Sequence, residues 1–238
     1  MDQKNSPVDL KKNVLQGFIV SMPVVVGYIP IGFAFGVLAK KVGLSSMNAV
    51  FMSIIVFAGS SQLIAIGLLV AGASALSIII ATFIVNLRHL LMTAALSPYL
   101  KRWRALALTL FSYQITDETF AIHAERFSSG DTNKTAAFTI NIVSQLSWIT
   151  GTVLGIATSG FIKDVKPFAL DYALIAMFIG LLVFQIKSKT QILVAILSGC
   201  VSILLYLAGI DQWNIILATL LSATFGILVE KWIKKRFY

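Results

Sequence analysis

Long apolar runs separated by short polar or basic breaks dominate the chain. A membrane-spanning α-helix needs about 20 consecutive, mainly apolar residues, and most of these runs have about that length. The pattern therefore predicts an all-α, polytopic integral membrane protein with about eight transmembrane helices, or seven if one of the short C-terminal runs does not span. The predicted spans lie at 14–38, 47–70, 74–96, 105–123, 136–160, 168–186, 192–208 and 213–229.

The first run carries Pro23 and Pro30 together with several glycines. Proline removes a backbone donor inside a helix, so we expect this span to be kinked or broken. An ordinary bent helix is the alternative. The glycines also permit close packing against a neighbouring helix.

The second run is interrupted by Gly59, Ser60, Ser61 and Gln62. Small and polar residues in the middle of a span predict local unwinding, which exposes backbone N–H groups at the N-terminus of a half-helix. Such a terminus suits a carboxylate. In the alternative interpretation the two serines bond their own helix and Gln62 bonds a neighbour.

The third run holds Asn86, Arg88 and His89 near its C-terminal end, which Pro98 marks. Arg88 either extends to the membrane interface or pairs with a carboxylate inside the protein. We do not expect a metal at His89, because no other ligands cluster around it in the sequence.

The fourth run contains Gln114, Asp117 and Glu118. An ionised group at a helix centre costs roughly 2.5–3.5 kcal/mol on insertion scales, so two adjacent carboxylates indicate a function. In one continuous helix Gln114 and Glu118 would share a face, and the two carboxylates would point about 100° apart. Their expected roles are substrate binding and proton relay; a static ion pair with Arg88 is the alternative.

The composition supports a membrane domain and excludes a large soluble one. Hydrophobic residues make up 58% of the chain, charged residues 12%, and no long hydrophilic block is present, so we expect one transmembrane domain, 1–238. A faint internal similarity suggests two diverged four-helix halves, 14–127 and 135–238. The net charge of +9 fits basic residues between spans rather than nucleic-acid binding, and their bias predicts cytoplasmic termini. The lone Cys200 excludes an internal disulfide.

Three motifs, in this order and spacing, resemble the signature stretches of the AzlC-type branched-chain amino acid permeases. They are FAGSSQ at 57–62, NLRHLLM at 86–92 with the terminating Pro98, and TDETF at 116–120. The resemblance is strong over roughly 17–127. It implies a secondary transporter in the cell membrane that exports valine, leucine or isoleucine, driven by an ion gradient, with protons as the expected ion. It also implies a small AzlD-type membrane protein as a hetero-oligomeric partner.

With this resemblance, the polar clusters form one expected site for a zwitterion. The substrate carboxylate is assigned to the serine cluster and the ammonium to the two acidic residues. The expected substrate-binding residues are Gly59, Ser60, Ser61, Gln62, Gln114, Asp117 and Glu118. Those expected to serve ion coupling or charge balance are Asp117, Glu118, Arg88, His89 and Asn86.

No enzymatic activity, cofactor or metal is expected, and the sequence has no phosphate-cradling Gly-rich Lys loop for ATP. Two other functions remain open. A channel would line a continuous pore with the same polar residues, whereas an assembly subunit of a two-component permease would not transport by itself.

Overall fold

The fold is described from a computed structural model, which covers residues 7–162, 179, 182–183, 186, 188–210 and 214–237. Most of the predicted span 168–186, and the first residue of the predicted span 213–229, lie outside these described residues. The chain divides into two compact units, Met1–Phe178 and Ile179–Tyr238. The division into halves 14–127 and 135–238 stays a prediction.

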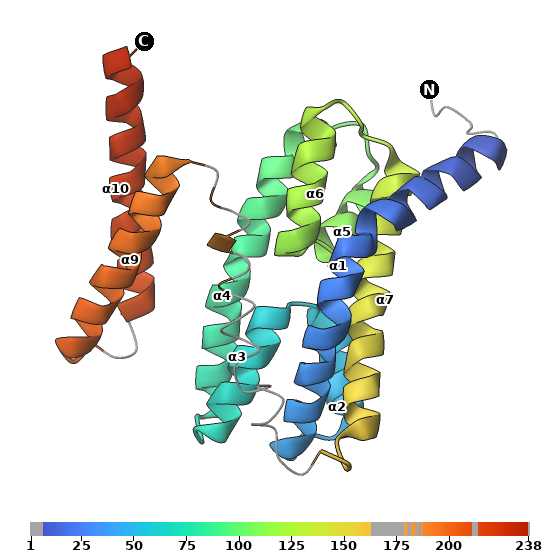
Figure 1. Ribbon diagram of the computed structural model, residues 1–238, viewed down its shortest axis with the longest axis horizontal. Helices are drawn as coiled ribbons and strands as arrows, with labels where there is room; N and C mark the ends of the chain where they lie inside the picture. Colours follow the sequence, from blue (N-terminus) through green and yellow to red (C-terminus); the bar gives the residue numbers. More distant parts are fainter. Residues whose placement is uncertain are drawn as a thin grey trace. The chain divides into compact units, whose positions relative to one another are not determined.

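Every regular element among the described residues is helical, which confirms the all-α prediction. The first unit contains α1 (Pro7–Lys41), α2 (Ser46–Phe51), the π-helix η1 (Met52–Val56), α3 (Gly59–Val70), α4 (Ala75–Leu96), the 3-10 helix η2 (Ser97–Tyr99), α5 (Ala105–Tyr113), α6 (Asp117–Ser128) and α7 (Lys134–Thr158). The second unit contains α9 (Lys189–Leu207) and α10 (Asn214–Phe237), which pack as a hairpin (Figure 1).

Four stretches of the described residues are long and apolar enough to cross a membrane. These are Asp9–Lys41, Ala75–Tyr99, Lys134–Thr158 and Lys189–Leu207. They coincide with the first, third, fifth and seventh predicted spans. Pairs of shorter helices occupy the second and fourth.

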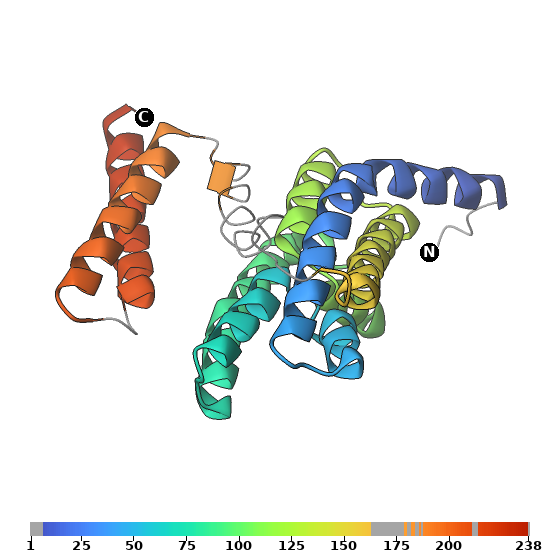
Figure 2. The same ribbon diagram turned by 60° about the horizontal axis from the view of Figure 1, so that its bottom comes forward.

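Helix α1 continues through both of its prolines, so the span that was predicted to be kinked or broken is not broken. Its N-terminal part runs at an angle to the rest of the helix (Figure 2). Prolines bend a helix by removing one hydrogen bond each and crowding the preceding turn.

Helices α1 and α7 lie side by side over much of their length (Figures 1 and 2). Their backbones meet at glycines. A Cβ atom on Gly36 would lie 2.2 Å from the carbonyl oxygen of Thr152, and one on Gly155 would lie 2.1 Å from that of Phe33. Side chains would not fit there, so the glycines permit the close helix contact that the sequence predicted.

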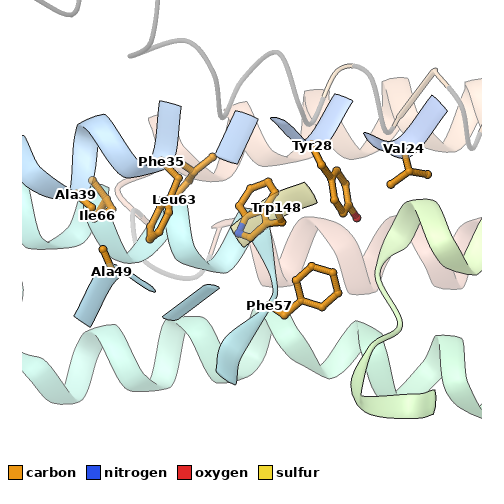
Figure 3. Packing of buried hydrophobic residues seen from close by; sticks show 9 residues of the cluster. All are labelled: Val24, Tyr28, Phe35, Ala39, Ala49, Phe57, Leu63, Ile66 and Trp148. Carbon is orange, nitrogen blue, oxygen red and sulfur yellow. The ribbon is translucent and has the colours of Figure 1, made fainter. Parts of the chain in front are cut away.

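An aromatic cluster centred on Trp148 fills the space between α1, η1, α3 and α7 (Figure 3). Tyr28 meets the indole edge-on at a centroid distance of 5.4 Å, and Phe35 stacks on it at 6.4 Å. Phe57 packs edge-on against Tyr28. All four rings are buried, and the cluster holds α1, α3 and α7 together beside the interruption described next.

Candidate functional site

The second predicted span is interrupted between η1 and α3. Phe57 adopts a left-handed conformation with φ 41° and ψ 49°, and α3 begins at Gly59 after the non-helical Ala58. The predicted unwinding is thus confirmed. No side chain caps the new helix, which leaves its first N–H groups without a capping acceptor.

The two serines of this half-helix form hydrogen bonds with different kinds of partner. Ser61 Oγ donates to the carbonyl of Ala58 at 3.0 Å, as the alternative interpretation had it. Ser60 Oγ instead accepts from the guanidinium of Arg88 on α4. Of the two serines, it is Ser60 that connects this helix terminus with another helix through its side chain.

A second interruption separates α5 from α6. Thr116 accepts from the backbone N–H of Thr119, and Thr119 Oγ1 accepts from the N–H of Thr116, which together form a capping box. The expectation of one continuous helix over 105–123 is therefore wrong, and Gln114 does not share a helical face with Glu118. A threonine cap followed by two acidic residues in the first turn favours a helix start at this position.

Arg88 bridges the two interruptions. One of its terminal nitrogens lies 3.0 Å from Asp117 Oδ2 and also donates to Ser60. Asp117 is 11% exposed and Arg88 27% exposed. Arg88 therefore pairs inside the protein instead of extending to the membrane interface. Both helix starts face this one cation.

Glu118 contacts hydroxyl groups instead of a cation. The Tyr28 hydroxyl oxygen lies 2.5 Å from Glu118 Oε2 and 2.6 Å from Thr116 Oγ1, and the tyrosine is 5% exposed. In Figure 3 its oxygen points away from α1. Sequence reasoning missed Tyr28, although a tyrosine between the glycines and prolines of a membrane span is a polar group that requires a partner.

The two glutamines assigned to the site are held in separate networks. Gln62 is fully buried, donates to Ser53 Oγ at 3.1 Å and accepts from the Trp148 indole at 3.1 Å. Gln114 donates to Gln145 at 2.8 Å. Both side chains bond to residues of α7. They lie next to the interruptions, and these bonds do not involve Arg88.

The amide of Gln145 reaches the first interruption. It donates at 3.0 Å to the carbonyl of Ile54 in η1, which also accepts from the Tyr113 hydroxyl. Side chains from α5 and α7 thereby satisfy a backbone carbonyl next to the unwound segment, as a break at membrane depth requires.

Asn86 and His89 are not brought into this network. Asn86 Oδ1 and His89 Nε2 are buried atoms without a hydrogen-bond partner in the described structure. Across the described residues, no three His, Cys, Asp or Glu side chains gather as a metal site would require. The two residues share a helix with Arg88, but their predicted part in charge balance rests on the sequence alone.

The resulting arrangement carries opposite charges within a short distance. An uncapped helix N-terminus and a guanidinium form the positive side, and Asp117 and Glu118 in the first turn of α6 form the negative side. A small molecule with a carboxylate and an ammonium group could replace the internal ion pair by two new ones.

Two discontinuous helices that meet at polar residues inside a bundle of apolar spans are typical of membrane transporters, and this class fits the fold better than an enzyme. A family model described as AzlC protein matches residues 23–162, more than half of the chain. The chain therefore belongs to the AzlC family, a family of multi-pass membrane transport proteins.

Relatives cover nearly the whole chain. A membrane protein of Archaeoglobus fulgidus is 32% identical over 91% of this chain and 94% of its own length. The inner membrane protein YgaZ of Escherichia coli is 31% identical over 90% of this chain and 88% of its own. The branched-chain amino acid transport protein AzlC of Bacillus subtilis is 26% identical over 71% and 66%. No solved structure matches the chain significantly.

Proposed function

We propose that the protein exports branched-chain amino acids (valine, leucine and isoleucine) across the cell membrane, driven by a proton gradient. The Bacillus subtilis relative is a branched-chain amino acid transport protein, which supports the substrate class. The observation that carries the proposal is Arg88, which binds Ser60 at one helix interruption and Asp117 at the other.

In the proposed binding mode the substrate carboxylate takes the place of Asp117 at Arg88. It also accepts from Ser60 and from the uncapped N–H groups of α3, whose positive end favours an anion. The substrate ammonium binds Asp117 in turn. Each charge keeps a partner throughout, which matters because an unpaired charge in a low-dielectric site is expensive.

Topology and partner belong to the same proposal. Eight spans with both termini in the cytoplasm follow from the apolar runs and from the bias of basic residues. A small AzlD-type membrane protein as partner follows from the motif resemblance. Co-purification of the two proteins after joint expression tests this partnership, with the chain expressed alone as the control.

Transport in proteoliposomes tests the function. Labelled valine, leucine and isoleucine should move in a saturable and stereoselective manner. Their flux should increase when a pH gradient is imposed. Each measurement should be made with and without the partner protein. Flux that rises linearly with concentration and ignores stereochemistry would instead identify a channel. Flux only in the presence of the partner, unchanged by D117N, would identify an assembly subunit.

Ser60→Ala should weaken apparent substrate affinity roughly 10- to 100-fold, the equivalent of one lost hydrogen bond to a charged group. Thr93→Ala is the matched control, because the Thr93 hydroxyl lies on α4 and bonds only the carbonyl of Leu90 in its own helix. Equal affinity in both variants would remove the α3 terminus from the binding site.

A further inference from the structure

The two adjacent carboxylates of α6 have partners of different chemistry. Asp117 pairs with Arg88 at 3.0 Å. Glu118 lies against the hydroxyl group of Tyr28, which in turn contacts Thr116. A guanidinium can only donate hydrogen bonds and keeps its positive charge, so it favours the ionised form of a carboxylate beside it, whereas a hydroxyl can both donate and accept.

We propose that Glu118 is the proton-carrying carboxylate of the transport cycle, that Asp117 stays ionised to pair with Arg88 or the substrate ammonium, and that Tyr28 is the residue that positions Glu118 in both protonation states. This division rests on the proposed transport function. It assigns separate roles to two neighbouring residues that sequence alone could not distinguish.

The hydrogen bonds can be counted for each state. When Glu118 is ionised, the single hydroxyl proton of Tyr28 is donated to Oε2, and the Thr116 hydroxyl donates to the tyrosine oxygen. When Glu118 is protonated, it donates to the tyrosine oxygen and Tyr28 donates to Thr116 Oγ1. In both states Thr116 keeps a lone pair for the N–H of Thr119, so the cap of α6 is retained.

The proton step is balanced by water. A hydronium ion on one side of the membrane transfers its proton to the Glu118 carboxylate, which forms an O–H bond and leaves a water molecule. The reverse transfer on the other side restores the carboxylate. No group other than the carboxylate changes its number of protons, and only the order of donors among three hydroxyl-type oxygens changes.

The charged groups around Glu118 support this assignment over the reverse one. Among the described residues of the neighbouring helices, α1 presents Tyr28, α4 carries Arg88 and His89, α3 has no titratable side chain, and α7 has only Lys134 at its first position. Protonation of Asp117 would leave Arg88 partly buried without a counter-charge. Protonation of Glu118 removes no partner from any cation.

Infrared difference spectra of the purified protein between acidic and neutral pH test the assignment directly. The carbonyl band of a protonated carboxylic acid should be lost in E118Q and kept in D117N. Glu125→Gln is the matched control, since Glu125 lies exposed on the same helix. Y28F should shift the band, because its hydrogen-bond partner is gone. Loss of the band in D117N, or its persistence in E118Q, would overturn the proposal.

Proteoliposome transport supplies the second measurement. Stimulation of valine flux by an imposed pH gradient should fall to a ratio of about one in E118Q and Y28F and stay at the wild-type ratio in E125Q. A wild-type ratio in E118Q would refute the role of Glu118. If the wild type moves no amino acid at all, the transport function fails, while the infrared result still decides which carboxylate is protonated. If E118Q does not fold, E118D should retain the band at a shifted frequency.

Discussion

Replacing Gly36 by alanine is expected to push helices α1 and α7 apart. The new Cβ atom would lie 2.2 Å from the Thr152 carbonyl oxygen and 3.0 Å from the Ile156 nitrogen, whereas ordinary contacts begin at 3.4 Å. The obstacle is the backbone of α7, so no side-chain rotation can remove it. The helices must separate by roughly 1 Å, or the helix must bend locally.

Overpacking of this kind costs about 1–3 kcal/mol, whereas alanine in place of a helical glycine contributes about 0.5–1 kcal/mol in the other direction. The net destabilisation is therefore on the order of 1–2 kcal/mol. For a chain of this size that lowers the midpoint of thermal unfolding by roughly 2–8 °C. Transport should fall as well, because α1 carries Tyr28 and α7 carries Trp148.

Gly27 provides the matched control on the same helix. A Cβ atom there meets no other atom within 4 Å, so Gly27→Ala should raise the midpoint by a few degrees through helix propensity alone. Thermal unfolding in detergent, followed by the loss of monodisperse protein, measures both variants. A Gly36→Ala midpoint equal to or above that of Gly27→Ala would refute backbone contact between α1 and α7.

Two further predictions concern other polar contacts. Trp148→Phe removes the donor to the buried Gln62 and should lower stability by about 1–3 kcal/mol, which thermal unfolding would reveal; an unchanged midpoint would contradict the network. Burial raises the pKa of Asp131, but hydrogen bonds from the Arg126 guanidinium and the Asn133 amide outweigh it, so the pKa lies below its ordinary value. The ionised Asp131 side chain therefore stabilises the folded protein above the ordinary aspartate pKa. This contribution is lost as the pH falls through the lowered pKa of Asp131 in the folded state. On acidification, the midpoint of thermal unfolding of Asp131→Asn should consequently fall less than that of the wild type. If the two midpoints fell equally with pH, the Asp131–Arg126 pair would not contribute to stability.

The apolar pattern was sufficient to predict the helical class and the positions of the uninterrupted spans. Hydrophobic length alone determines these features, and α4 and α7 follow the predicted runs closely. The cluster at Gly59 also correctly predicted an interruption, because several adjacent small and polar residues in the middle of an apolar span favour local unwinding.

The interruption before Asp117 was not predicted, although its signal is present. Thr116 followed by acidic residues is a helix start, but the surrounding apolar run led to the expectation of a continuous span. The Tyr28–Glu118 contact could not be predicted, since it joins residues 90 positions apart and depends on how α1 packs. The Arg88–Asp117 pair was among the alternatives, because opposite charges at membrane depth have few other partners.

The π-helix of Met52–Val56 gives this part of the chain a fixed length. A π turn holds one residue more than an α turn, and the neighbours Ser53 and Ile54 both contact α7, through a side chain to Thr152 and through a carbonyl to Gln145. Deleting one residue would restore an α-helical ladder and rotate one side of the segment by about 100° relative to the other. Homologous chains that keep these contacts should therefore differ by substitution here, and place their insertions in the loops.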